Sequence, residues 1–227
     1  YPAQAASSLP LGHQAECLIL AALVFGVMLR VLFDSRIRRP VEHLALTLLG
    51  FFYLPFMLSF FIRLAQWGAA GCFELSPARV GVFLASYIAV VVKLGDVGAF
   101  AVGTSLGRHK MLPRVSPKKT WEGLAGGLAA STLASVAMVE LARCYGLGGP
   151  LATLGYWHGA VMGLVLGCVG VLGDLVESMF KRAANIKDSA GLLPGMGGIL
   201  DMFDSLTFAP AALYFYLAWF VGPAGAA

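Results

Sequence analysis

The strongest constraint on this chain is a series of long runs of apolar residues. A helix needs about 20 such residues to cross roughly 30 Å of hydrocarbon. Candidate spans lie at about residues 17–33, 44–62, 80–105, 121–142, 152–180 and 205–222. Apolar residues make up 59% of the chain and charged residues only 12%, whereas soluble domains have about 45–50% and about 25%. The sequence therefore predicts a polytopic membrane protein and excludes a soluble domain, a disordered chain and a nucleic-acid-binding module.

The apolar runs favour helices over strands. Backbone in lipid must satisfy its own hydrogen bonds, which only helices and closed barrels achieve. A barrel strand alternates apolar and polar residues, and the stretch ILAALVFGVML at 19–29 does not. We expect an all-α bundle of about six transmembrane helices that forms a single integral-membrane domain over residues 1–227. Residues 1–16 lack a basic segment followed by a cleavage site, so we do not expect a signal peptide there.

The basic residues indicate an orientation. Most of the 16 Lys and Arg residues lie in three predicted loops, near residues 34–43, 106–120 and 181–204. Six spans put all three loops on one side of the membrane, and the positive-inside rule makes that side cytoplasmic. We expect the protein to lie in the bacterial inner (plasma) membrane, with both ends of this chain on the side opposite the cytoplasm. The net charge of +4 indicates anionic lipid headgroups or a phosphorylated substrate as partners.

The cysteines show no pattern of a metal site or a disulfide framework. They are Cys17, Cys72, Cys144 and Cys168. None forms a CxxC pair, and each lies among apolar or small residues, so we expect free thiols.

Several charged residues lie inside the predicted spans, and two of them, Lys93 and Asp96, belong to a first polar segment at residues 93–110. An ionisable group there costs several kcal/mol, so by default it faces a cavity and marks a site. For Asp96, which lies between Gly95 and Gly98, and for Asp174 a functional site is the favoured interpretation. For Lys93 and Glu140, snorkelling or pairing at a helix end is an equally good alternative.

A second polar segment, at residues 113–123, combines hydroxyl and ammonium groups. It contains Ser116, Lys118, Lys119 and Thr120 just before an apolar run. Hydroxyls, lysines and a helix N-terminus together suit a phosphate group. Thr120 also suits the role of helix cap, so a solvated basic loop that ends in a cap is an open alternative.

A third polar segment emerges from the fifth predicted span. Asp174, Ser178, Lys181 and Arg182 fall at i, i+4, i+7 and i+8 and share one helix face, which Glu177 flanks. This face is expected to leave the apolar span on the cytoplasmic side.

Two more carboxylates, Asp201 and Asp204, precede the last span at i, i+3 spacing. Helix capping accounts for one of them. Two carboxylates beside Lys and Arg also suit a hard divalent cation, which takes oxygen ligands. The three polar segments together favour the handling of a phosphorylated, metal-bound substrate at the membrane face.

The polar segments resemble the CDP-diacylglycerol synthase (phosphatidate cytidylyltransferase) family. Its pattern S-x-x-K-R-x4-K-D, then HGG-x-x-DR-x-D, corresponds here to SMFKR at 178–182, KD at 187–188 and MGGILDMFD at 196–204. The stretches SPKKTWEG at 116–123 and GDVGAF at 95–100 are also similar to that family. The likeness extends over about residues 93–205, in the family's order.

Two positions depart from that pattern. Met196 stands where the family usually has His, and Met202 where it usually has Arg. Neither side chain can donate a proton or pair with phosphate. His109 or Arg182 is an alternative source of either function, and a somewhat different lipid substrate is another explanation.

The resemblance implies that CTP and phosphatidate react to give CDP-diacylglycerol and pyrophosphate. It implies Mg²⁺ as cofactor, with a second monovalent or divalent cation as an option. The implied metal ligands are Asp188, Asp201, Asp204 and Asp174. The implied catalytic residues are Asp188, Lys187, Lys181, Arg182 and Asp174, of which the cations hold the lipid phosphate or the leaving group. The implied substrate-binding residues are Ser116, Lys118, Lys119, Thr120, Ser178 and Asp96.

Other functions stay open at this point. The nearest is a related membrane enzyme that acts on a prenyl or another phosphorylated lipid. An ion-coupled transporter also uses intramembrane Asp and Lys, but its polar residues would lie at the midplane. A non-catalytic membrane subunit is the third class. Membrane lipids are expected partners, nucleic acid is not, and the glycine-rich spans make a homodimer an option.

Overall fold

A computed structural model describes residues 11–34, 37, 39–67, 77–147, 149–183 and 204–222, without the side chains of residues 11–17, 77 and 78. The chain divides into two compact units, Tyr1–Pro55 and Phe56–Ala227. That residues 1–227 form a single integral-membrane domain stays a prediction.

The first unit contains two apolar helices. Helix α1 is Leu11–Phe33, and α2 is Pro40–Phe51. Proline suits the first turn of α2, because the N–H groups there have no partner within the helix. Five π-helical residues, Phe52–Phe56, follow α2 and include Pro55. A proline lacks the N–H of the regular ladder, so a local change of helical geometry is the expected result.

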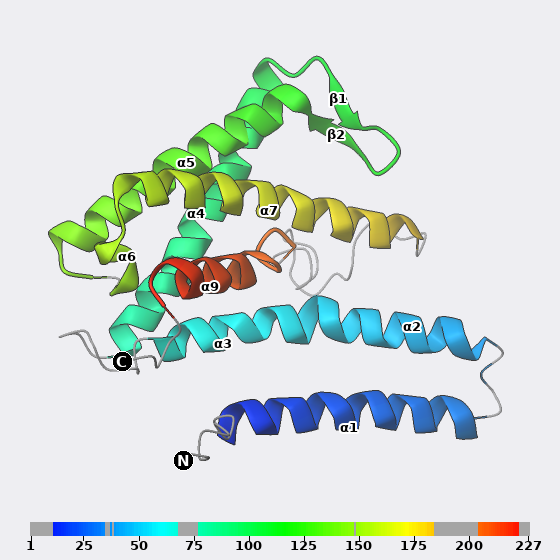
Figure 1. The fold of residues 1–227 in the computed structure, drawn as a ribbon. Helices are drawn as coiled ribbons and strands as arrows, with labels where there is room; N and C mark the ends of the chain where they lie inside the picture. Colours follow the sequence, from blue (N-terminus) through cyan, green and yellow to red (C-terminus); the bar gives the residue numbers. More distant parts are fainter. Residues whose placement is uncertain are drawn as a thin grey trace, which may run out of the picture. The chain divides into compact units, whose positions relative to one another are not determined.

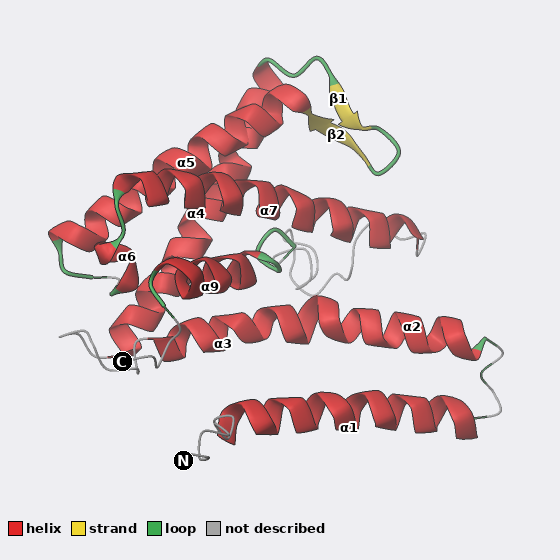
Figure 2. Ribbon diagram, viewed as in Figure 1, coloured by secondary structure: helices red, strands yellow, loops and turns green. Residues whose placement is uncertain are grey.

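The second unit contains the remaining helices and one hairpin (Figure 1). They are α3 (Met57–Trp67), α4 (Pro77–Ser105), β1 (Lys110–Leu112), β2 (Ser116–Thr120), α5 (Trp121–Cys144), α6 (Pro150–Thr153), α7 (Tyr156–Ala183) and α9 (Ala209–Phe220). Helices dominate the described residues (Figure 2), so the all-α prediction is confirmed.

Four helical segments are long and apolar enough to cross a membrane. They are Pro40–Trp67, Arg79–Ser105, Trp121–Cys144 and Tyr156–Ala183. Two shorter apolar helices are Leu18–Phe33 and Ala209–Phe220. All six lie at the positions of the predicted spans; the four long segments confirm spans there, and the two shorter helices leave the first and last spans as predictions. The chain is therefore an integral membrane protein built as a helix bundle.

Glycines allow α4, α5 and α7 to pack closely. A Cβ added to Gly127 of α5 would lie 2.9 Å from the Cβ of Ala99 in α4. One added to Gly163 of α7 would lie 2.5 Å from the Cα of Thr132 in α5. Both distances are shorter than van der Waals contact, so these positions need glycine. Helix association in lipid depends on such close packing because no hydrophobic effect drives it.

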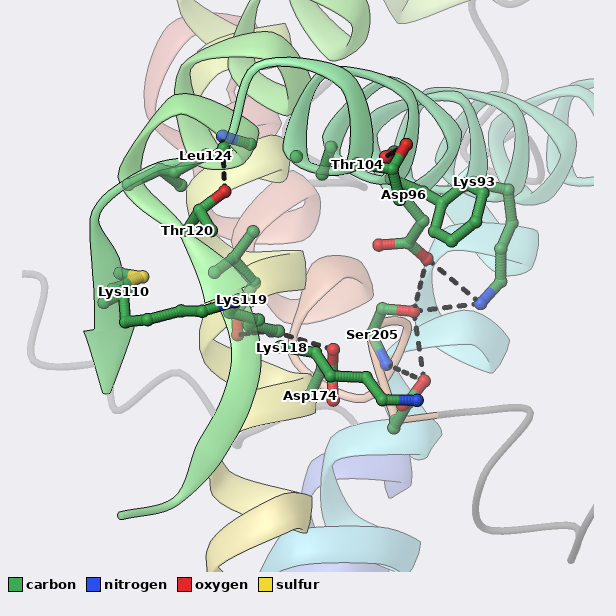
Figure 3. Close-up of a pocket in the computed structure, with 18 residues that line it drawn as sticks. Lys93, Asp96, Thr104, Lys110, Lys118, Lys119, Thr120, Leu124, Asp174 and Ser205 are labelled. Carbon is green, nitrogen blue, oxygen red and sulfur yellow. Dashed lines mark hydrogen bonds and ion pairs between the residues drawn. The ribbon is translucent and has the colours of Figure 1, made fainter. Parts of the chain in front are cut away.

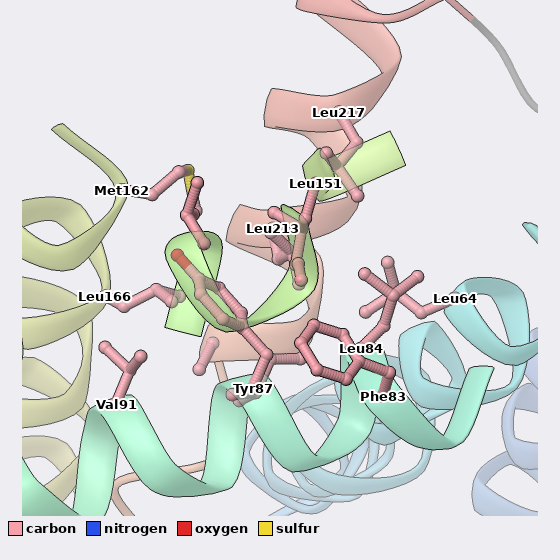
Figure 4. Close-up of a cluster of buried hydrophobic side chains, with 14 of the residues drawn as sticks. Leu64, Phe83, Leu84, Tyr87, Val91, Leu151, Met162, Leu166, Leu213 and Leu217 are labelled. Carbon is pink, nitrogen blue, oxygen red and sulfur yellow. The ribbon is translucent and has the colours of Figure 1, made fainter. Parts of the chain in front are cut away.

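The apolar core of the second unit joins α4 to α3, α6, α7 and α9 (Figure 4). Tyr87 of α4 lies in it, fully buried. Its hydroxyl is 2.6 Å from the Oγ of Ser135, which donates a hydrogen bond to the carbonyl of Gly159 at 2.5 Å. This buried network ties α4, α5 and α7 together at a point where an unpaired hydroxyl would be costly.

The segment at 106–120, expected as a loop, contains an antiparallel hairpin. Strands β1 and β2 pair Lys110 with Thr120 and Leu112 with Ser116. Proline at 117 keeps Ser116 extended, which suits a strand. The N–H of Trp121 donates to the carbonyl of His109 at 3.0 Å and closes the base of the hairpin. Sequence alone missed the hairpin because its strands are short and polar.

Candidate functional site

A cavity of ≈ 720 Å³ lies in the second unit, where α4, the hairpin, α5 and α7 meet (Figure 3). Its size is that of a typical small-molecule site. Its charged lining residues are Lys93, Asp96, Lys110, Lys118, Lys119, Asp174 and Asp204. The structure thus brings residues of all three polar segments of the sequence to one place.

Ser205 links the aspartates on two sides of the cavity. Its hydroxyl lies 2.9 Å from an oxygen of Asp96 in α4 and 3.1 Å from an oxygen of Asp204. Lys93 donates to the same hydroxyl at 2.9 Å and forms an ion pair with Asp96 at 3.3 Å. Lys93 and Asp96 therefore both line the cavity. The alternative of a paired residue describes the contact of Lys93 with Asp96, and a functional role for either residue stays a prediction.

Lys119 of β2 reaches across the cavity to α7. Its ammonium lies 2.8 Å from Asp174 and donates to the carbonyl of Val171 at 3.2 Å. Ser178, one turn further along α7, donates to Asp174 at 3.3 Å. The hairpin is thereby connected to the carboxylate side of the cavity by a half-buried ion pair, which solvent screens less than a surface pair.

Three carboxylates form a cluster with the spacing of a metal site. Oxygens of Asp174, Glu177 and Asp204 all lie within 4.8 Å of one another. Glu177 is only 1% exposed and pairs with Lys181 at 3.0 Å. Sequence reasoning assigned Asp174 and Asp204 to a metal but not Glu177. The sequence feature that points to Glu177 is its position three residues after Asp174, within an apolar helix.

Glycine on α7 allows Asp204 to approach this cluster. A Cβ on Gly173 would collide with the carbonyl oxygen of Asp204 and lie 3.3 Å from its carbonyl carbon. A Cβ on Gly170 would lie 3.5 Å from the carbonyl oxygen of Ser205. The turn that begins at 204 thus rests directly on the backbone of α7, beside Asp174.

The electrostatics of Asp204 follow from its position. Burial raises the pKa of its carboxyl above the ordinary value. The Ser205 N–H, which donates to it at 2.5 Å, lowers the pKa, and the negative charge of Asp174 raises it again. A half-buried carboxylate beside two others is poised to accept a cation, because a cation offsets both the burial and the repulsion.

Several of the predicted site residues line a second, smaller pocket of ≈ 160 Å³. It is lined by Ser116, Lys118, Ser178, Lys181 and Arg182, with Val115 and Pro117. Lys118 lines both spaces. The predicted polar face of α7 is therefore divided: Asp174 faces the large cavity, and the two cations at the helix end face the small pocket.

Two side chains hold the hairpin onto α5. Thr120, 4% exposed, caps α5 by accepting the N–H of Gly123 at 3.1 Å, so the predicted cap is confirmed. Glu122 accepts the N–H of Arg108 at 3.1 Å, and one of its oxygens is 2.6 Å from the Nδ1 of His109. These contacts position the lysines of the hairpin over the cavity.

Glu140 lies outside the cavity and has partners of its own. Tyr156 donates to it at 2.7 Å, and the thiol of Cys144 lies 3.5 Å away. The alternative of a paired residue at a helix end is therefore the right one for Glu140. Cys144 and Cys168 are free thiols, as expected.

Several predicted residues lie outside the described part of the chain. They are Lys187, Asp188, Asp201, Met196 and Met202, together with the side chain of Cys17 and all of Cys72. Their predicted roles stay predictions.

Comparison with known proteins gives one consistent family. The model of the cytidylyltransferase family matches residues 4–220. Phosphatidate cytidylyltransferases of Haemophilus influenzae and Bacillus subtilis are 40% and 46% identical over 137 and 134 residues, which is 60% and 59% of this chain and 46% and 47% of theirs. That of Brucella suis is 38% identical over 168 residues, 69% of this chain and 59% of its own. The chain spans about half the length of the curated relatives it matches.

Proposed function

The chain belongs to the cytidylyltransferase family, and on that premise we propose that it transfers the cytidylyl group of CTP to phosphatidate at the membrane. The products are CDP-diacylglycerol and pyrophosphate. One observation carries the proposal: a cavity inside a membrane helix bundle is lined by lysines and by a cluster of carboxylates. Lysines suit the phosphates of two anionic substrates, and clustered carboxylates suit the metal that accompanies a triphosphate.

The reaction needs no covalent intermediate. An oxygen of the phosphatidate phosphate attacks the α-phosphorus of CTP and forms a new P–O bond. The bond between the α-phosphorus and the bridging oxygen breaks, and pyrophosphate leaves with that electron pair. A phosphate monoester is largely ionised at pH 7, so no side chain has to remove a proton. Positioning and charge neutralisation are then the work of the protein.

The carboxylate cluster is the proposed Mg²⁺ site. Asp174 and Asp204 would hold the ion, with Glu177 as a further oxygen donor and with Asp188 and Asp201 as predicted ligands. The cluster fits a hard cation because its oxygens lie within 4.8 Å of one another and burial disfavours the charged form of Asp204. Bound there, Mg²⁺ supplies neutralisation of phosphate charge and of the leaving group. A second cation stays part of the proposal.

The hairpin lysines are the proposed triphosphate site. Lys110, Lys118 and Lys119 line the cavity from one side. Lys118 also borders the small pocket of Lys181 and Arg182. A volume of ≈ 160 Å³ is far below that of a nucleotide site, so this pocket suits a phosphate group alone, such as part of the departing pyrophosphate.

We assign the cavity to the cytoplasmic face of the bacterial inner membrane. The hairpin and the end of α7 are two of the three basic segments, and they line one pocket. Their association at one end of the bundle supports an orientation by the positive-inside rule. CTP would then enter from the cytoplasm, while the acyl chains of phosphatidate stay in the bilayer.

Labelled CTP tests this function. The full-length protein in detergent micelles is given phosphatidate, Mg²⁺ and CTP labelled on the α-phosphate, and labelled lipid is measured. We expect labelled lipid to fall by about two orders of magnitude or more in Asp174→Asn, because that residue pairs with Lys119 and belongs to the carboxylate cluster. Glu42→Gln, which removes an exposed carboxylate paired with Arg39, is the matched control and should keep full turnover.

The outcome of that assay separates the remaining functions. If labelled product forms with a prenyl phosphate but not with phosphatidate, the lipid acceptor is a prenyl phosphate. A folded protein that neither makes labelled lipid nor binds CTP would refute the cytidylyltransferase proposal.

A further inference from the structure

One charged residue in the cavity lies deep in a membrane span. Lys93 is near the middle of α4, 12 residues before its last residue, Ser105. At 1.5 Å per residue this is about 18 Å along the helix axis. A lysine in a span is costly and is retained where it has a function. The other lysines of the cavity lie on the hairpin, outside the spans.

The contacts of Lys93 leave its ammonium accessible to a ligand. Within the described residues it donates to Ser205 at 2.9 Å and pairs with Asp96 at 3.3 Å. An ammonium group has three N–H donors, and these two contacts use two of them. The side chain is 46% exposed where it faces the cavity. Figure 3 shows Lys93 on the opposite side of the view from Lys110, with Asp174 and Ser205 between them.

Besides Asp96 and Ser205, the surroundings of Lys93 include apolar side chains of its own helix. On a helix, residues 97 and 100 follow residue 93 at i+4 and i+7 and share its face. Val97 is 61% exposed and Phe100 is 73% exposed, and Phe100 also lines the cavity. Exposed apolar side chains on a membrane span face lipid chains. The cavity at Lys93 thus combines one cation with a surface for acyl chains, whereas three lysines, Lys110, Lys118 and Lys119, line the hairpin end.

We propose that Lys93 binds the phosphomonoester of the lipid acceptor and thereby determines which substrate occupies this end of the cavity. The hairpin lysines then hold the nucleotide phosphates at the other end. This assignment rests on the proposed function. It gives the two anionic substrates separate cations, so that each is neutralised before their phosphates approach one another.

The alternative role for Lys93 is that of a counter-ion for Asp96 alone. A counter-ion would affect folding, metal binding or turnover, but it would not discriminate between the two substrates. The test is therefore a comparison of two KM values. Lys93→Met removes the charge at similar length, and Lys93→Arg keeps it. Arg79→Met removes a cation from the same helix, 14 residues away and outside the cavity lining.

The full-length protein is measured in mixed micelles, varying phosphatidate at saturating CTP and then CTP at saturating phosphatidate. Loss of a charge-assisted hydrogen bond predicts that Lys93→Met raises the KM for phosphatidate roughly tenfold to a hundredfold. The KM for CTP should stay within about twofold. Lys93→Arg should recover most of the lipid affinity, and Arg79→Met should change neither KM. Lys118→Met should raise the KM for CTP instead.

Two results would overturn the assignment: a KM increase confined to CTP, or a lower kcat with both KM values unchanged. If Lys93→Met fails to fold, the double variant with Asp96→Asn removes both charges of the pair. A raised KM for phosphatidate in the double variant supports the assignment, and an unchanged one overturns it. If the wild-type protein has no turnover, the proposed function fails. Binding of phosphatidate micelles against phosphatidylcholine micelles is then compared between the wild type and Lys93→Met. Loss of the preference for phosphatidate in Lys93→Met supports the assignment, and an unchanged preference overturns it.

Discussion

The close approach of Asp204 to α7 makes Gly173→Ala the most informative single substitution. In an exposed helix, alanine in place of glycine stabilises by about 1 kcal/mol, so helix propensity alone predicts a more stable protein. At 173, however, the new Cβ would meet the carbonyl oxygen of Asp204. We expect the turn at 204 to move away from α7.

The magnitude follows from the geometry. The carbonyl of Asp204 must retreat by on the order of 1 Å to restore an ordinary contact, and its carboxylate moves with it. A misplacement of about 1 Å in a catalytic site costs about 100-fold in rate, which is about 2.7 kcal/mol of activation free energy. The same shift separates Asp204 from Asp174 and Glu177, so the Mg²⁺ concentration needed for half-maximal rate should rise as well.

Two measurements check this expectation on the same protein samples. The first is kcat/KM for labelled lipid formation as a function of Mg²⁺ concentration. The second is calorimetric Mg²⁺ binding without substrates, which does not depend on turnover. The matched control is Gly155→Ala, just before α7, where an added Cβ meets no atom within 4 Å. It should leave both measurements unchanged.

A displacement of Asp204 also predicts that the effects of two substitutions are not additive. If Gly173→Ala acts by displacing Asp204, the double variant with Asp204→Asn should be little worse than Asp204→Asn alone. A Gly173→Ala protein with wild-type kcat/KM and wild-type Mg²⁺ dependence would refute the idea that this contact holds the carboxylate in place.

Three further substitutions test other parts of the structure. Thr120→Ala removes the cap that accepts the N–H of Gly123 and should destabilise by about 1 kcal/mol, seen as a lower Tm in detergent that Thr120→Ser restores. Tyr87→Phe removes the buried hydrogen bond to Ser135 and should cost about 1 kcal/mol, again measured as Tm, with kcat/KM unchanged. Burial raises the pKa of Asp204, so without metal its stabilising contribution is complete below the ordinary aspartate pKa and is lost as pH rises through the raised one. The Tm in EDTA should therefore fall with pH, and Asp204→Asn should flatten that curve.

Much of the architecture was predictable because it depends on local composition. A membrane span needs only enough consecutive apolar residues, a one-dimensional property, so the four long apolar helices and the two shorter ones all lie where spans were predicted. The cap at Thr120 was also predictable, since capping involves residues three positions apart. The hairpin was not, because short polar strands have no hydrophobic period to reveal them.

The residues of the site were predictable as types but not as partners. Asp96, Lys119, Asp174 and Asp204 were all identified from charges within or beside apolar runs. That Lys93 contacts Ser205, 112 residues later, follows only from how α4 packs against the turn before α9.

By itself, the sequence determined the class of protein, the spans and the candidate charges. Only the tertiary structure decided that Glu177 joins two aspartates, that Lys181 and Arg182 face a separate pocket, and that Gly173 admits the backbone of Asp204. The physical reason is the separation along the chain over which each interaction acts. Hydrophobic length and capping act between neighbours in the chain, whereas the distance between two charges depends on how closely glycine-bearing helices pack.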